Sequence, residues 1–457
     1  MSSTIKRNKY EIDMCNGTIM DKLISFSLPL MLSGILQLMF NAVDIIVIGR
    51  FSGSQSLAAV GSTTALIAVF TNLFIGISLG ANVLSARFYA AGKDKEMSET
   101  VHTAITLALI SGIIMVFVGL IFAKPVLELM DTPDDVINLS TLYMRIYFMG
   151  MPFFMLYNYG ASILRAVGDT KRPLFYLIVA GIANAGLNMC LVIIFHLGVA
   201  GVAIGTVISQ LISSILVLRC LYQSETSYQL RFSKLKIQKE YLKQIFQVGI
   251  PAGIQSTVIN FSNVLLQSSV NSFGSIAMAG YTAANNIFGF LYVTVNAVTQ
   301  ACMSFTSQNY GVGKWKRMDR VLIDCLILSF VAMMILGNSA YFFGPKLLTI
   351  YTSNSKVIQC GMEILLYTTV TYFLCGFMDL FPGALRGMGR SGVPMILSII
   401  GTVGTRIVWI FWIFPNHRSL DILFISYPAS WIITIVLQVI CYYFVRKQLY
   451  AKMRAEA

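Results

Sequence analysis

The stretch "SLPLMLSGILQLMFNAVDIIVIGR", residues 27–50, decides the fold class of this chain. It is almost wholly apolar and longer than the ~20 helical residues that cross a hydrocarbon core. Similar runs recur along all 457 residues, of which 56% are hydrophobic and 12% charged. Because a soluble protein of this length needs a far larger polar surface, the sequence predicts an all-α polytopic membrane protein.

Twelve apolar segments follow one another, and each is predicted to be one transmembrane helix. They span residues 23–48, 57–81, 100–122, 137–161, 173–195, 199–220, 244–270, 277–302, 320–343, 362–384, 394–414 and 420–445. The first segment is too long for the apolar region of a signal peptide, so we expect it to act as an uncleaved insertion signal.

The chain also repeats itself. "ILRAVGDTKRP" (163–173) has a counterpart in the second half, "ALRGMGRSGVP" (384–394), and "YAAGKDKEM" (89–97) is matched by "YGVGKWKRM" (310–318) at the same separation. Six helices per repeat is an even number, so both halves insert with the same orientation. The prediction is two six-helix lobes related by pseudo-twofold symmetry along the membrane normal.

The domain prediction follows from this repeat. Its five parts are a cytoplasmic leader (1–22), an N-terminal six-helix lobe (23–220), a cytoplasmic basic linker (221–243), a C-terminal six-helix lobe (244–445) and a cytoplasmic tail (446–457). Two lobes facing each other across a cleft suit alternating access better than one fixed pore.

The distribution of positive charge predicts the orientation. Of the 33 Lys and Arg residues, 26 fall in segments on the side of the N-terminus and five on the other side, while Arg145 and Arg406 lie within spans. This asymmetry places both termini in the cytoplasm of a multi-pass protein of the cell membrane. The net charge of +13 lies between the apolar runs and therefore does not indicate nucleic acid.

No enzyme signature is found in the sequence. It contains no glycine-rich phosphate loop, its three histidines are isolated, and its eight cysteines are scattered without a C-x-x-C pair. We therefore expect no catalytic triad, metal site or organic cofactor, and no direct coupling to ATP hydrolysis.

Polar residues inside the first span are the strongest functional candidates. Gln37, Asn41 and Asp44 share one helical face, with Asp44 toward the extracellular end. An ionised carboxylate at such a depth costs several kcal/mol, so a protonated or cation-bound Asp44 is favoured. Asp44 is therefore placed to exchange a proton or hold a cation; the alternative is an interfacial carboxylate near Arg50.

Two amides in the fifth span, Asn184 and Asn188 of "NAGLN", lie one helical turn apart. They are suited to hydrogen-bond a protonated Asp44 or its cation. The alternative is that they only join helices within the lobe, a common use of Asn in membranes.

Asp379 in the tenth span is the second deep carboxylate. Two alternatives stay open: Asp379 lines the central cleft and meets a cationic substrate, or it pairs with Arg406 of the eleventh span. Asn158 occupies the corresponding place in the first repeat, so the carboxylate is not duplicated, and we predict that these three residues border the substrate cleft.

The first span contains Pro29, fifteen residues before Asp44. A proline removes one helical hydrogen bond and permits a kink. A bend at Pro29 would move Asp44 relative to neighbouring helices; a static kink is the alternative. The repeat partner of Asp44 is Leu266, so the duplicated fold itself does not require a carboxylate there.

Five stretches in this order resemble the MATE family, the multidrug and toxic compound extrusion transporters, over essentially the whole chain. They are "SLPLMLSGILQLMFNAVDIIVIGR" (27–50), "LAAVG" (57–61), "ARFYAAGKDKE" (86–96), "ILRAVGDTKRP" (163–173) and "ALRGMGRSGVP" (384–394). The resemblance implies a secondary antiporter that expels small organic, often cationic or amphipathic, compounds in exchange for H+ or Na+. We expect it to work as a monomer among membrane lipids.

The resemblance also assigns roles to residues. Asp44 matches the acidic position of the family's first helix, Pro29 matches the proline proposed to bend, and Asn184 and Asn188 fall in its Asn-rich fifth-helix segment.

Two departures narrow the resemblance. Val192 stands where many members have an Asp, and Ile259 stands where the Na+-coupled branch has a Glu. The missing Glu makes the chain resemble the DinF-like branch more closely, with coupling through the N-terminal lobe. The missing Asp disfavours a two-carboxylate proton relay in that lobe.

Two other functions remain as alternatives. One is a lipid or lipid-linked saccharide flippase, which would need several basic side chains in its spans to hold phosphates. The other is a membrane receptor or assembly protein without transport, which the short loops disfavour.

Overall fold

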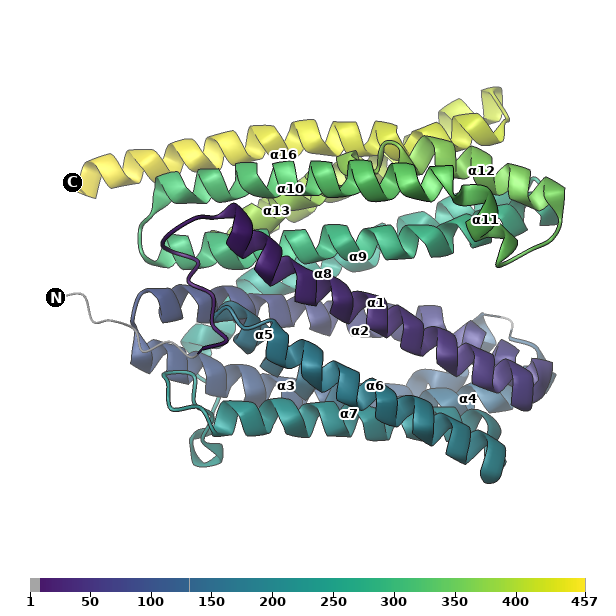
Figure 1. Cartoon of the computed structure of the whole chain (residues 1–457), viewed down its shortest axis with the longest axis horizontal. Coiled ribbons are helices and arrows are strands. Elements are labelled where there is room, and N and C mark those ends of the chain that lie inside the picture. Colours follow the sequence, from purple (N-terminus) through teal and green to yellow (C-terminus); the bar gives the residue numbers. More distant parts are fainter. Residues whose placement is uncertain (1–8, 131, 457) are drawn as a thin grey trace. The chain divides into compact units, whose positions relative to one another are not determined.

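The computed structural model describes residues 9–130 and 132–456, and every regular element in this part of the chain is helical. Leader residues 1–8, Asp131 and Ala457 lie outside the described residues, so the predictions that include them are followed only for their neighbours. The predicted all-α class is confirmed, and Figure 1 shows long helices throughout.

The helices follow one another along the chain. The α-helices are α1 (Met20–Phe51), α2 (Gly53–Ala90), α3 (Asp94–Leu129), α4 (Asp134–Met149), α5 (Met151–Ala166), α6 (Lys171–Met189), α7 (Gly198–Tyr222), α8 (Lys239–Asn271), α9 (Ser275–Gly311), α10 (Trp315–Phe342), α11 (Gly344–Thr349), α12 (Ser355–Thr369), α13 (Tyr372–Gly387), α14 (Gly392–Ser398), α15 (Thr405–Val408) and α16 (Leu420–Glu456). Short segments of other helix types are η1 (Cys190–Ile194), η2 (Phe232–Lys234), η3 (Ile399–Gly404), η4 (Trp409–Ile413) and η5 (Phe414–Asn416).

Each of the twelve predicted spans falls on helix, but not all of them qualify as spans by length and apolarity. Within the described residues nine helical segments do so, and the pair α12–α13, bent by 45°, raises the number to ten. The predicted span 137–161 is instead divided into α4 and α5 at Gly150. The predicted span 244–270 lies within α8, whose many polar side chains lower its hydropathy.

The chain forms two compact units, which are described separately. Unit 1 comprises Met1–Met14 and Leu28–Gly253, and unit 2 comprises Cys15–Ser27 and Ile254–Ala457. The first turns of α1 thus belong to unit 2, and the first half of α8 belongs to unit 1. Both changes of unit fall beside a proline, Pro29 in α1 and Pro251 in α8. The lobe boundaries at residues 220 and 244 stay a prediction.

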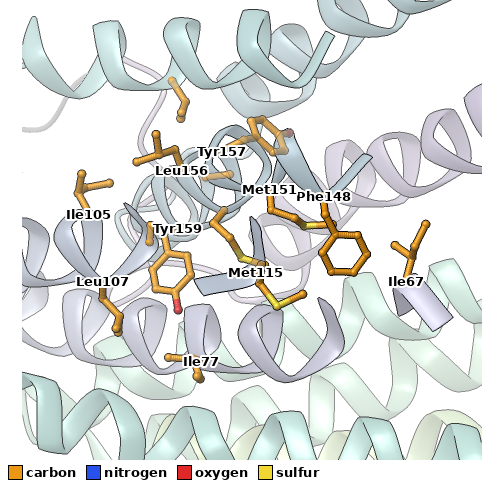
Figure 2. Packing of buried hydrophobic residues seen from close by; sticks show 14 of the residues in the cluster. Ile67, Ile77, Ile105, Leu107, Met115, Phe148, Met151, Leu156, Tyr157 and Tyr159 are labelled. Carbon is orange, nitrogen blue, oxygen red and sulfur yellow. The ribbon is translucent and has the colours of Figure 1, made fainter. Parts of the chain in front are cut away.

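Unit 1 has a core of large apolar side chains between α3, α4 and α5. Figure 2 shows Met115, Phe148, Met151 and Tyr159 converging there, and all four are fully or almost fully buried. A side chain at Gly119 would overlap the Phe148 ring, so this glycine permits the contact. Small residues at helix interfaces are a general device of membrane proteins, which depend on close packing between helices.

The first half of α8 packs backbone to backbone on α2 within unit 1. Gly76 and Gly80 of α2 face Gly249 and Gly253 of α8, and a Cβ atom on any of the four would overlap the opposite main chain. Each pair of glycines is separated by one helical turn, so both helices present a smooth stripe. Because of this close contact, the first half of α8 is part of unit 1.

Unit 2 holds the end of the leader and the start of α1. The Phe26 ring packs edge-to-face on Phe305 of α9, with centroids 5.6 Å apart. The Lys314 ammonium donates to the Cys15 carbonyl (2.9 Å), and the Arg317 guanidinium donates to the Gly17 carbonyl (2.9 Å). The Lys314 ammonium also donates to the Asn16 side chain (2.7 Å), so both main-chain and side-chain acceptors anchor the end of the leader.

The repeated motifs of the sequence are helix-ending turns. Each contains a glycine with positive φ: Gly92 (65°), Gly313 (71°), Gly168 (100°) and Gly389 (79°). In all four turns the N–H of the next residue donates to the carbonyl five positions earlier, at 2.9 or 3.0 Å. This is the Schellman geometry, in which the left-handed position favours glycine. The two halves of the sequence thus end equivalent helices in the same way.

Candidate functional site

The site in unit 1 is built around Asp44 of α1. Its side chain is buried, with 9% of the residue exposed. Asn188 of α6 donates its amide Nδ2 to Asp44 Oδ1 at 2.5 Å. Among the described residues no Lys, Arg or His forms an ion pair with this carboxylate. The charge is thus held by a neutral donor inside the helices of unit 1.

The two asparagines of "NAGLN" meet in the same network. Asn188 Nδ2 also lies 3.3 Å from Asn184 Oδ1, and Asn184 Nδ2 donates weakly to Thr206 Oγ1 of α7 (3.4 Å). The structure therefore brings together Asp44, Asn184 and Asn188, three of the five residues predicted for ion coupling.

Local backbone features make room for Asn188. Gly205 of α7 faces it, and a Cβ atom at this position would overlap Asn188 Oδ1. Just after Asn188, α6 widens into the π-helical segment η1. Such π-helical segments are rare in proteins, and they are found frequently at functional sites. Asn188 Oδ1 itself is buried and accepts no hydrogen bond from any described residue.

The other two predicted residues of this face lie apart from the network. Gln37 and Asn41 are exposed within unit 1, and neither forms a hydrogen bond with a described residue. The helical periodicity placed them correctly on the face of Asp44, but only the carboxylate lies deep enough between helices to meet α6.

Sequence reasoning missed three neighbours of Asp44. Thr206 of α7 lies beside the carboxylate, and Tyr143 and Tyr147 of α4 lie near enough to feel its charge. No sequence signal marks them, because they come from helices that are far from α1 along the chain. The Thr206 hydroxyl therefore joins the two amides as a polar group near Asp44.

Unit 2 carries a buried positive charge instead. Arg406 of α15 is only 3% exposed. Its NH1 donates to Asn263 Oδ1 (2.8 Å) and to Ser262 Oγ (3.2 Å), both on α8. Its guanidinium carbon lies 4.7 Å from the centre of the Tyr427 ring of α16. All these partners are uncharged.

The remaining predicted residues have separate surroundings. Asp379 of α13 is half-buried and interacts with the charge of Arg386, and the described residues show no ion pair between Asp379 and Arg406. Asn158 of α5 donates to the Phe154 carbonyl of its own helix (2.8 Å). Their proposed place along a substrate cleft stays a prediction.

Pro29 lies inside α1, which continues as helix from Met20 to Phe51. The Pro29 carbonyl accepts a hydrogen bond from the Ser33 hydroxyl (2.8 Å). A bending role for this proline stays a prediction.

The unit 1 site contains the kinds of group that reversible binding of a proton or cation requires. A buried carboxylate with an amide donor and nearby hydroxyl groups lowers its electrostatic energy by taking up a proton or a small cation. Ionisable groups inside a duplicated bundle of membrane helices are typical of secondary transporters. Fold and site therefore define a polytopic helical transporter.

Comparison with known proteins identifies the family. The MatE family model matches residues 29–190 and again 251–412, and the two matched regions are equal in length. The chain therefore belongs to the MatE family, whose members are transporters rather than enzymes. The predicted repeat is thus confirmed as two copies of one family unit.

Individual proteins show the same likeness. The chain is 30% identical to "Probable multidrug resistance protein YoeA" of Bacillus subtilis, with 93% of both chains covered, and 24% identical to "Multidrug export protein MepA" of Staphylococcus aureus, with 83% and 84% covered.

Solved structures agree on the fold. An outward-facing MATE family transporter of the MOP superfamily superimposes with a TM-score of 0.89 at 20% identity, covering 98% of this chain and all of the other. A MATE crystal structure in the bent conformation gives a TM-score of 0.86 at 21% identity, covering 95% and 96%.

Proposed function

We propose that this chain is a secondary antiporter for multidrug efflux, which exports small organic compounds, cationic or amphipathic, in exchange for H+ or Na+. Membership of the MatE family and the multidrug-related names of its relatives support the class of substrate. Two sequence repeats, each able to form half of a carrier, support alternating access.

The single observation that carries the coupling role is Asp44, buried and bonded to Asn188 without a cationic partner among the described residues. A proton or cation bound there neutralises the carboxylate and changes the relative stability of two carrier conformations. Such a ligand shifts the equilibrium only by its difference in affinity for the two states. The donors around Asp44 would set that difference.

Finer assignments remain part of this proposal. We place both termini in the cytoplasm, on the distribution of Lys and Arg. Ile259 in place of a glutamate supports the DinF-like branch and coupling through the N-terminal half. Asp379 is our candidate for contact with a cationic substrate, since it lacks an ion pair among the described residues.

The experiment that tests coupling uses inverted membrane vesicles containing the full chain. Uptake of a fluorescent organic cation into the vesicle lumen, which corresponds to export from the cytoplasm, is followed under an imposed pH gradient and, separately, an imposed Na+ gradient. Asp44→Asn should reduce gradient-driven transport to the level of vesicles without the protein, because the amide cannot exchange a charge. The gradient that drives the wild-type chain identifies the ion.

Glu225→Gln is the matched control, since it makes the same change from carboxylate to amide at an exposed loop position after α7. It should leave gradient-driven transport near the wild-type rate. Full transport by Asp44→Asn under both gradients would show that the coupling ion binds elsewhere.

A further inference from the structure

Arg406 holds a buried guanidinium in unit 2, and the site around Asp44 does not explain how this charge is stabilised. A charge held inside membrane helices is costly and normally pairs with an opposite charge. Within the described residues, Arg406 has no carboxylate in ion-pairing range. Its Nε is buried and donates to no described acceptor. Unit 2 must therefore stabilise this cation with neutral groups.

Those neutral groups are the ones that bind a small cation. Asn263 offers an amide oxygen at 2.8 Å, Ser262 a hydroxyl oxygen at 3.2 Å, and Tyr427 the face of its ring at 4.7 Å. Amide and hydroxyl oxygens coordinate hard cations. An aromatic face attracts a cation through its quadrupole, more strongly where water is excluded.

The aromatic wall is itself fixed in place. The Tyr427 hydroxyl shares a hydrogen bond with the Tyr281 hydroxyl (2.9 Å), and the Tyr427 ring packs on Trp431 with centroids 5.8 Å apart. Tyr427 is therefore held with its ring toward the guanidinium by contacts that do not involve Arg406. This wall of the site does not depend on the cation for its position.

The sequence repeat relates this cation to the acid of unit 1. At the separation between the starts of the two family matches, residues 29 and 251, Asn41 corresponds to Asn263. Arg406 lies near the end of the second match, as α6 lies near the end of the first. Leu266, buried in unit 2, stands where unit 1 has Asp44. The corresponding helices thus carry an acid with amides in one unit and a guanidinium with an amide in the other.

We propose that Arg406 is a tethered cation, filling a cation-binding site of unit 2 that is formed by Asn263, Ser262 and the Tyr427 ring. The site has the acceptors for a guanidinium or a small metal cation, but the chain supplies the cation covalently. It follows that unit 2 does not exchange a free cation at this place. This inference stands apart from the proposed transport function.

The test removes the Arg406 side chain by substitution and adds a free guanidinium compound to the solution. Arg406→Ala is purified as the full chain in detergent, and its thermal midpoint is measured with millimolar methylguanidinium, or with the same concentration of urea, which has a similar shape and no charge. We expect the substitution to lower Tm by roughly 5–10 °C, because it removes a buried charge from its partners. Methylguanidinium should restore at least half of the loss and urea none of it, while the wild-type Tm changes with neither.

Two further variants cover the case in which Arg406→Ala does not fold. Arg406→Lys keeps a cation and Arg406→Met keeps an unbranched side chain of similar length without charge. The tethered-cation site requires Arg406→Lys to have a higher Tm than Arg406→Met. A Tm for Arg406→Met equal to or above that of Arg406→Lys, or an Arg406→Ala protein that ignores methylguanidinium, would overturn the inference. Because no readout involves transport, these results are independent of the Asp44 experiment.

Discussion

Units 1 and 2 each contain one copy of the family sequence, yet their buried charges differ in sign and in place: an acid on α1 in unit 1, and a guanidinium on α15 in unit 2. In unit 1, Asp44 accepts from Asn188; in unit 2, Arg406 donates to Asn263. The helix-ending turns are alike in both halves, with glycines at positive φ. This difference shows that the two units share their turns and their fold. The buried charges are not part of what they share, since each unit has its own.

The largest expected effect on stability comes from two separate variants that make the same change, Asn to Asp, one in each unit. Asn188→Asp would put two carboxylates in contact, and two such groups cannot both stay ionised without a penalty. Asn263→Asp would instead give Arg406 a counter-charge in place of a neutral acceptor. We expect Asn188→Asp to destabilise the protein by about 2–3 kcal/mol and Asn263→Asp to stabilise it by about 1–3 kcal/mol.

Thermal or denaturant unfolding of the two purified variants at neutral pH gives this comparison directly. Each variant serves as the control for the other, because the chemical change is identical. If both lose stability to the same extent, the contrast between the units has no energetic consequence.

The next prediction concerns Gly205, which leaves room for the Asn188 amide in unit 1. Gly205→Ala places a methyl group where Asn188 Oδ1 now lies, so Asn188 must move away from Asp44. The loss of a buried hydrogen bond to a charged group should cost about 1.5–3 kcal/mol in unfolding free energy. Binding of the coupling ion should weaken as well, because the donor to Asp44 is displaced.

Gly186→Ala is the matched control. Gly186 lies in α6 within one turn of Asn188, and a Cβ atom there meets nothing within 4 Å. In a helix interior this change should be neutral or stabilising by up to about 1 kcal/mol. Equal unfolding midpoints for the two alanine variants would mean that the room at Gly205 is not what positions the amide.

The smallest effect on stability is expected at a helix-ending turn, a feature that both units share. Gly313 has a φ of 71°, and a Cβ there would have only Trp315 Nε1 nearby, at 3.8 Å. Gly313→Ala therefore tests backbone strain almost alone and should cost about 1–2 kcal/mol in unfolding free energy. Gly313→Asn, which tolerates the left-handed region better, should recover part of the loss. Identical stabilities for the wild-type and alanine proteins would show that this turn does not need a glycine.

Much of the site could be predicted from residue types and spacing. Asp44, Asn184 and Asn188 were predicted together because carboxylates and amides are rare and costly inside apolar spans. Gln37 and Asn41 shared the helix face by periodicity, but periodicity does not tell how deeply each turn is covered by neighbouring helices. Asp379 and Arg406 were weighed as a pair; they are not paired in the structure, because Arg406 points to α8.

The sequence by itself determined the class of fold, the duplication and the family. These depend on long apolar runs and repeated turn motifs, whose physical meaning is local: the thickness of a bilayer and the backbone freedom of glycine. Only the tertiary structure decided which polar groups meet. Tyr143, Tyr147 and Thr206 come to Asp44, and Ser262 and Tyr427 to Arg406, from helices far apart in the chain. Such meetings depend on how helices pack and on where glycines allow close approach, which no local pattern specifies.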